Sequence, residues 1–148
     1  MSSSIRHASI QTGSLDEARR LLGASRLPTD DLHDPAIELL GAWDGATLIG
    51  AIGLQRCGDA GLLRSLAVAP AWQGRGLGHE LCARIVALAR QRRLVALYLL
   101  TTTAADFFRR VGFRQVQRDD VPDEIRTTAE FSSLCPSTAA VLRLDLSP

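Results

Sequence analysis

The stretch from Leu62 to Gln91 constrains the fold more than any other part of the chain. Its first part, residues 62–69, is mostly apolar, has the length of a strand and ends at Pro70, which cannot continue a hydrogen-bonded ladder. Its last part, residues 77–91, repeats apolar side chains at helical spacing. We therefore expect a mostly buried strand, a tight loop and an amphipathic helix.

The loop between them reads QGRGLG and covers residues 73–78, with glycine at alternate positions. Because glycine has no Cβ, the backbone there can turn tightly and bring its amide groups close to a ligand. The loop also opens a helix, where unpaired N–H groups and the helix dipole favour an anion. The pattern predicts a phosphate-binding turn, and a glycine-rich strand-to-helix turn without a ligand is the alternative.

The spacing excludes two familiar phosphate-binding loops. A P-loop requires lysine and then serine or threonine after its last glycine, whereas His79 and Glu80 follow Gly78. A dinucleotide-binding fingerprint requires an acidic residue at the end of the next strand, and the apolar run at 97–100 leads into threonines instead.

Two segments together resemble motifs of the GNAT acyl-CoA N-acetyltransferases. A strand ending in Leu-Ala-Val-x-Pro and followed by Gln-x-x-Gly-x-Gly resembles motif A, and residues 104–113, AADFFRRVGF, resemble motif B. The resemblance covers nearly the whole chain and implies one GNAT domain over residues 1–148. It implies an α+β fold with a mixed, mostly antiparallel sheet of six to seven strands, of which strands 4 and 5 splay apart, and about four flanking helices.

Local patterns predict the remaining elements. Ser-Leu-Asp-Glu at 14–17 is a capping-box pattern that predicts a helix through Leu22 with Gly23 as its stop. Asp44-Gly45 between apolar runs predicts a hairpin. Residues 27–35 are predicted to form a turn or short helix, which the resemblance places over the acceptor site as a lid; a solvated connector is the alternative. Further strands are predicted at 5–10, 39–43, 48–55, 94–100, 113–117 and 139–144, and helices at 104–111, stopped by Gly112, and after Pro122.

The resemblance implies acetyl-CoA as cosubstrate. It places the thioester beside the fourth strand and the pyrophosphate at the amides of the glycine loop. Gln73 stands where an arginine is more usual, so Arg75 is expected to supply the bidentate phosphate contact. Core packing is the alternative for the two phenylalanines of motif B. The implied cofactor-binding residues are Leu66, Ala67, Val68, Gln73, Gly74, Arg75, Gly76, Leu77, Gly78, His79, Phe107 and Phe108.

Two positions depart from the family's catalytic pattern. Phe108 stands where many members have a tyrosine acid, and Leu62 where many have a glutamate base. We predict a backbone amide at a strand bulge near Val68 as the oxyanion donor, and Glu130 as the group that attracts the ammonium or relays its proton; a merely solvated Glu130 is the alternative. Proton transfer contributes roughly 10²–10⁴-fold, and positioning and amide donors supply the rest. Direct attack by the amine, with water as base, is therefore sufficient.

The acceptor is expected to be a small amino-acid-like amine. Residues 98–104 and 130–136 resemble a small GNAT branch found with arsenic-resistance genes and, more distantly, the acetyltransferase domain of N-acetylglutamate synthases. This implies a glutamate-like acceptor or an arsenic- or phosphorus-containing analogue, with a role in arsenic resistance or detoxification. Other readings are metabolic glutamate acetylation, acetylation of an antibiotic or protein, and a non-catalytic acetyl-CoA-binding module.

Candidate acceptor contacts follow from strand alternation and from hydroxyl-rich turns. Arg64 is predicted to share a face with Leu62 and Leu66 and to clamp an acceptor anion, and a surface or salt-bridged arginine is the alternative. Hydrogen bonds to the acceptor are predicted from Thr102, Thr103, Ser132 and Ser133, for which ordinary turn and capping hydroxyls are the alternative.

Composition limits the remaining possibilities. The net charge of +1 gives no support for nucleic-acid or anionic-membrane binding. The chain has no apolar run of membrane-spanning length and no apolar signal core near its N-terminus, so we expect a cytoplasmic protein. The odd number of widely spaced cysteines, Cys57, Cys82 and Cys135, predicts free thiols, and neither they nor the histidines have metal-site spacing. The resemblance also implies a homodimer.

Overall fold

The structure, a computed structural model, describes residues 5–27, 29–129, 131 and 139–146. These residues form a seven-stranded sheet in the order β1-β2-β3-β4-β5-β7-β6, in which β4 and β5 are parallel and the other neighbours are antiparallel. The strands are β1 (Ile5–Ser9), β2 (Ile37–Asp44), β3 (Thr47–Cys57), β4 (Ala60–Val68), β5 (Ala96–Thr101), β6 (Arg114–Val116) and β7 (Ala140–Asp145).

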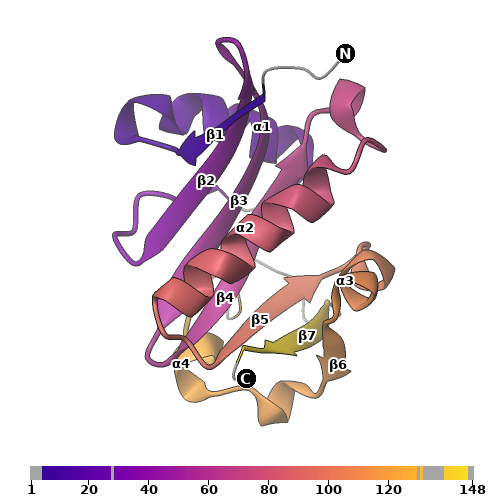
Figure 1. The fold of residues 1–148 in the computed structure, drawn as a ribbon. Coiled ribbons are helices and arrows are strands. Elements are labelled where there is room, and N and C mark those ends of the chain that lie inside the picture. The colour runs from indigo at the N-terminus through magenta and orange to yellow at the C-terminus, as the bar shows by residue number, and fades with distance from the viewer. Residues whose placement is uncertain (1–4, 28, 130, 132–138, 147–148) are drawn as a thin grey trace.

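Helices cover both faces of the sheet. The long helix α2 crosses one face and α1 lies behind the other (Figure 1). The apolar side of α2 packs on β2–β5, while α1 packs on β3 and β4. The helices are α1 (Leu15–Ala24), α2 (Leu77–Gln91), α3 (Ala105–Val111) and the short α4 (Asp123–Arg126). The predicted α+β architecture is thereby confirmed. No helix in the described ranges is both long enough and apolar enough to cross a membrane.

The splay of strands 4 and 5 is also confirmed. The two strands pair only where Ala60–Leu62 meets Ala96–Tyr98, and they separate beyond that point (Figure 1). The second half of β4 therefore has a neighbour on its β3 side and an opening on its β5 side. This opening faces the N-terminus of α2 and the start of α3.

A β-bulge in β4 changes which side chains share a face. Gly53 pairs with Arg64 but Ala51 pairs with Ala67, and Ser65 takes a left-handed conformation with φ 62°. Leu62 packs in the apolar cluster under α4, whereas Leu66 packs against the α2 cluster on the opposite face. The prediction that Arg64 shares a face with both leucines is wrong, because the extra residue shifts the alternation.

Helix α1 ends and begins differently from the predicted pattern. The Ser14 side chain makes no capping bond, and the Glu17 carboxylate instead accepts a hydrogen bond from the Leu48 amide at 3.0 Å, which ties α1 to the start of β3. Gly23 lies inside the helix, and the left-handed residue beyond it is Arg26, with φ 58°. By contrast, Gly112, with φ 115°, follows α3 as predicted.

The two described cysteines are free and buried on opposite faces of the sheet. Burial raises the pKa of the Cys57 thiol to about 11, with a smaller contribution from Glu124, and raises the pKa of the Cys82 thiol to about 12. Both thiols therefore stay protonated near neutral pH and are poor nucleophiles. Cys135 lies outside the described residues.

These raised pKa values predict a loss of stability at alkaline pH. Below about pH 8 the thiols are protonated in both states, whereas between about pH 9 and 11 they ionise mainly on unfolding, which favours the unfolded state by about 2 kcal/mol per thiol at pH 10.5. We expect the loss between pH 7.5 and 10.5, measured by urea denaturation, to be smaller in a Cys57→Ala/Cys82→Ala variant. Lysines do not interfere, because all 17 basic residues are arginines. Equal losses in both proteins would contradict this account.

Candidate functional site

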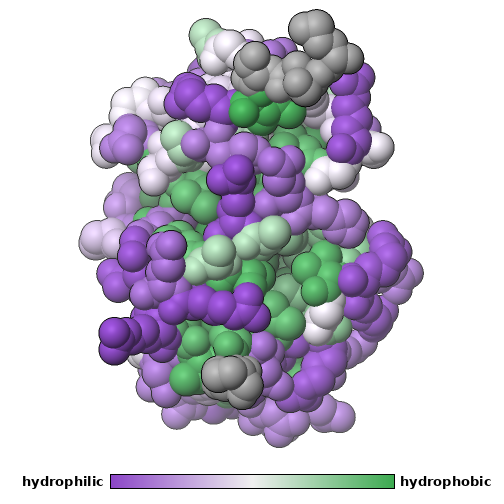
Figure 2. All heavy atoms as spheres, viewed as in Figure 1, coloured by the Kyte–Doolittle hydropathy of each residue, from purple (hydrophilic) through white to green (hydrophobic). Residues whose placement is uncertain are grey.

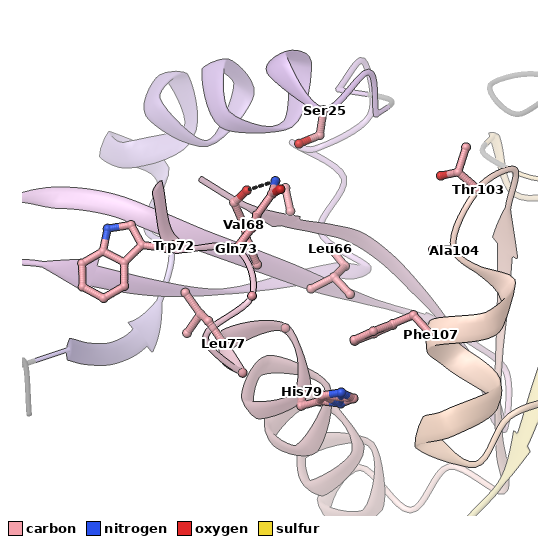
Figure 3. A pocket seen from close by; sticks show the side chains of 14 residues that line it. Ser25, Leu66, Val68, Trp72, Gln73, Leu77, His79, Thr103, Ala104 and Phe107 are labelled. Carbon is pink, nitrogen blue, oxygen red and sulfur yellow. Dashed lines mark hydrogen bonds between the residues drawn. The ribbon is translucent and has the colours of Figure 1, made fainter. Parts of the chain in front are cut away.

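A pocket of about 690 Å³ lies at the opening between β4 and β5. It is enclosed by the end of β4, the glycine loop with the first turn of α2, the start of α3 and the end of α1 (Figure 3). On the face of the molecule that carries α2, hydrophilic residues surround a central region in which hydrophobic residues are visible (Figure 2). The lining residues are Ser25, Leu66, Ala67, Val68, Trp72, Gln73, Gly74, Gly76, Leu77, Gly78, His79, Thr103, Ala104 and Phe107.

The glycine loop provides one end of the pocket with unpaired amide groups. Gly74 and Gly76 have φ values of 77° and 84°, which glycine adopts without steric cost. Gly76 is the N-cap of α2, and its carbonyl accepts the first helical hydrogen bond from the Glu80 amide at 3.1 Å. The amides of residues 77–79 precede that bond and have no acceptor within the helix. Together with the helix dipole they form a site suited to a phosphate.

The end of β4 presents a free strand edge to the pocket. The Ala69 amide donates to the Ile49 carbonyl at 2.8 Å, so by strand alternation the N–H and C=O of Val68 point away from β3, toward the opening. The bulge lies at residues 65–66, two residues before Val68, near which it was predicted. The Val68 carbonyl accepts a hydrogen bond of 3.0 Å from the Gln73 side-chain amide (Figure 3). Gln73 thus folds back onto β4 instead of extending from the loop.

Helix α3 contributes one phenylalanine to the pocket and one to the core. The Phe107 ring lies 4.7 Å from the His79 ring, centroid to centroid, and joins α3 to the first turn of α2. It also lies 3.4 Å from the position that a Cβ on residue 78 would occupy, so a glycine there gives the ring room. Phe108 is buried and meets Phe113 edge to face at 5.7 Å. Packing is therefore the role that the structure gives Phe108.

The structure brings most of the predicted cofactor residues together and leaves others apart. Arg75 is exposed, with its guanidinium carbon 5.0 Å from the centroid of the Trp72 ring, and Thr102 is exposed outside the lining. Three predicted residues, Glu130, Ser132 and Ser133, lie outside the described residues. The predicted residues that line the pocket are Leu66, Ala67, Val68, Gln73, Gly74, Gly76, Leu77, Gly78, His79, Thr103 and Phe107.

Sequence reasoning missed three lining residues, Ser25, Trp72 and Ala104. Ala104 is the first residue of the motif B segment and Trp72 directly precedes the glycine loop, so the two motifs were signals for both residues. Ser25 follows α1, about forty residues before β4 ends, and no local pattern connects it to the pocket.

Arg64 holds a carboxylate of the chain itself. Its side chain is 0% exposed, and its two terminal nitrogens lie 2.6 and 2.5 Å from the two carboxylate oxygens of Asp31. One of these nitrogens also donates to the Gln55 side-chain carbonyl at 2.9 Å. The salt-bridged alternative therefore describes Arg64, which does not line the pocket. The pair fastens Asp31, which lies within the predicted lid at residues 27–35, to β4.

Few residues that line the pocket could act as a general acid or base. His79 is the one ionisable side chain among the lining residues, and it lies at the phosphate end. Leu62, at the position of the family base, is buried with Ile125 and Phe131. The hydroxyl of Tyr98 accepts a hydrogen bond of 2.5 Å from Arg143 within that same region. Among the residues described, no group of three or more His, Cys, Asp or Glu side chains could hold a metal ion.

A family model and several curated amino-acid acetyltransferases match part of the chain. The model, an acetyltransferase (GNAT) domain, matches residues 35–115. An amino-acid acetyltransferase of Mycobacterium tuberculosis is 34% identical over 79 residues, which are 53% of this chain and 42% of that protein. The chain therefore spans less than half the length of this relative.

Solved structures share the fold over nearly the whole chain. A GNAT-family acetyltransferase of Staphylococcus aureus has a TM-score of 0.81 with 16% identity and covers 97% of this chain and 100% of its own. N-acetylglutamate synthase of Neisseria gonorrhoeae, solved with coenzyme A and L-arginine, has a TM-score of 0.82 with 21% identity over 99% of this chain and 34% of its own. A second structure of that synthase, with coenzyme A and N-acetyl-glutamate, has a TM-score of 0.80, with 22% identity over 100% of this chain and 36% of its own.

Replacing Gly76 by aspartate tests the phosphate site. A carboxylate at this position repels a bound pyrophosphate, and the left-handed φ of 84° adds backbone strain that a suitable control must share. We expect coenzyme A affinity, measured by calorimetry, to fall at least about tenfold without unfolding of the protein. Gly45→Asp is the control, because Gly45 has φ 59° and lies in the β2–β3 turn. Equal affinities in the two variants would refute the phosphate site.

Replacing Arg64 by alanine tests the buried pair. The substitution leaves the Asp31 carboxylate partly buried without its cation, and we expect a loss of about 3–5 kcal/mol in unfolding free energy. Arg92→Ala, which removes the more exposed bidentate pair with Glu38, is the control and should change stability little. Urea denaturation of both variants measures the difference, and similar losses would argue against a structural role for Arg64.

Proposed function

Because the chain belongs to the GNAT acetyltransferase family, we propose that it is an acetyl-CoA-dependent N-acetyltransferase acting on the amino group of a small, glutamate-like amino acid. One observation carries the proposal: a single pocket joins a helix N-terminus with unpaired amides to a free strand edge at Val68. We further propose that residues 1–148 act as one catalytic domain. A cytoplasmic location and a homodimer stay predictions.

Different regions of the pocket bind different portions of acetyl-CoA. The amides of residues 77–79 receive the pyrophosphate, and the pantetheine arm enters the opening beside Leu66 and Val68. The Val68 carbonyl, which Gln73 now occupies, becomes the acceptor for a pantetheine amide when the Gln73 side chain moves aside. Phe107 forms the wall opposite the strand edge, where an apolar ring suits the aliphatic part of the arm.

The reaction is direct acetyl transfer. The neutral amine attacks the thioester carbonyl carbon, and the resulting oxyanion accepts a hydrogen bond from the Val68 amide, which points into the opening. The tetrahedral intermediate then collapses, the carbon–sulfur bond breaks and the coenzyme A thiolate leaves. The amine loses one proton and the thiolate gains one, so the balance requires no other reactant.

Water carries the protons in this proposal. The lining near Leu66 offers only the hydroxyls of Ser25 and Thr103, and Phe108 has no proton to give. Glu130 stays a candidate for the relay and lies outside the described residues. The rate then depends on the fraction of acceptor amine that is deprotonated, so kcat/KM should rise with pH up to the pKa of that amine.

The identity of the acceptor is supported by the named relatives. The Mycobacterium tuberculosis relative is an amino-acid acetyltransferase, and the structure of the Neisseria gonorrhoeae synthase contains N-acetyl-glutamate. A glutamate-like amino acid is therefore the first acceptor to test. Arsenic- and phosphorus-containing analogues share its α-amino acid group and belong in the same panel, although no reported relative concerns arsenic.

Thiol release from acetyl-CoA tests this function. We expect release to be stimulated by glutamate or a glutamate-like arsenic or phosphorus amino acid, and not by aminoglycosides. Acetylation of lysine side chains on the enzyme cannot mimic turnover, because the sequence contains no lysine. Turnover of aminoglycosides alone would instead indicate antibiotic acetylation. Tight acetyl-CoA binding without turnover of any acceptor would indicate a non-catalytic binding module.

A further inference from the structure

An acidic acceptor needs a cation that the pocket lining does not contain. Arg64 is buried against Asp31 and does not line the pocket. Arg75 lies over Trp72 in the phosphate loop. We propose that Arg26 binds the side-chain carboxylate of the acceptor. This inference rests on the proposed function and assigns the residue that selects an acidic side chain.

Arg26 directly follows a residue that lines the pocket away from the glycine loop. Ser25, the residue before it, lines the pocket at the end of α1, and Thr103 lines it across the opening (Figure 3). Arg26 is not itself among the lining residues, but adjacent Cα atoms are about 3.8 Å apart, so its Cα lies next to the pocket wall, and in our proposal its long side chain extends over the pocket mouth when an acidic acceptor binds. Arg26 is exposed, and no described side chain pairs with its guanidinium. It is therefore available to a ligand.

The geometry of the reaction explains why the distal carboxylate is the one recognised. The amine must lie at the thioester beside Leu66 and Val68, inside the opening. A glutamate-like side chain then extends outward from the reacting nitrogen, toward the end of α1. The helix C-terminus carries partial negative charge, which repels an anion. A guanidinium at this position offsets that repulsion and can hold a carboxylate in two parallel hydrogen bonds.

The backbone conformation at Arg26 allows its side chain to be removed without destabilising the end of α1. Its amide donates to the Gly23 carbonyl and the Leu27 amide donates to the Leu22 carbonyl, both at 3.0 Å. This is the left-handed position after a helix where glycine is preferred. Arg26→Gly therefore removes the side chain while relieving backbone strain, and the folded protein should be retained.

Arg93 is a matched control at the end of α2. It is also exposed and left-handed, with φ 62°, and its amide donates to the Arg90 carbonyl at 3.0 Å while the Leu94 amide donates to the Ala89 carbonyl at 3.1 Å. The glycine loop lies at the other end of this 15-residue helix, about 22 Å away. Arg93→Gly thus repeats the local change without touching the pocket.

Steady-state kinetics with glutamate and its neutral isostere glutamine test the inference. We expect Arg26→Gly to raise KM for glutamate about 10- to 100-fold, and to leave KM for glutamine and for acetyl-CoA within about twofold of the wild type. Arg26→Lys, which keeps the charge but loses the planar fork, should have an intermediate effect. Arg93→Gly should match the wild type for every substrate.

The outcomes separate this inference from the proposed function. If the wild type acetylates glutamate and Arg26→Gly does so with unchanged KM, the role of Arg26 is refuted and the proposed function stands. An equal rise for glutamine, or an equal effect of Arg93→Gly, would also refute it. If the wild type acetylates no acidic amino acid, both the proposed acceptor and the role of Arg26 fail.

Discussion

The separation of β4 from β5 is the constraint on which the site depends. Parallel pairing stops after Leu62 meets Tyr98, and from there the backbone groups of β4 on that side have no ladder partner. A sheet that continued to pair would satisfy these groups and close the pocket. The bulge at Ser65 accompanies the divergence and brings Leu66 to the α2 face. An unpaired edge inside the protein is unfavourable unless a ligand, water or a side chain satisfies it, and Gln73 does this for the Val68 carbonyl.

The rest of the fold holds the two sides of the opening in place. On one face, α2 packs along β3 and β4, and the left-handed Gly74 and Gly76 let the chain turn from the short 3-10 helix Pro70–Trp72 after β4 into α2. On the other face, the bidentate bond between Arg64 and Asp31 fastens the segment after α1 to β4. A buried pair of this kind adds less net stability than its short distances suggest, but it specifies one arrangement of the segment.

The sequence predicted the parts of the site that depend on neighbouring residues. The strand, glycine loop and helix from Leu62 to Gln91 were predictable because turn chemistry and apolar periodicity act over a few residues. The bulge was not, since it depends on register with β3. The partner of Arg64 lies 33 residues away, and the position of Ser25 depends on how α1 packs. The capping box predicted at Ser14 does not form, because the Glu17 carboxylate accepts a hydrogen bond from Leu48 of β3 rather than from the start of its own helix.

The crystal structure of the complex with acetyl-CoA tests the central claim most directly, namely that the β4–β5 opening is the cofactor site. We expect the pyrophosphate at the amides of residues 77–79 and a pantetheine amide at hydrogen-bond distance from the Val68 carbonyl, with the Gln73 side chain displaced from that carbonyl. Acetyl-CoA bound outside the opening, with the bond from Gln73 to Val68 intact, would contradict the account.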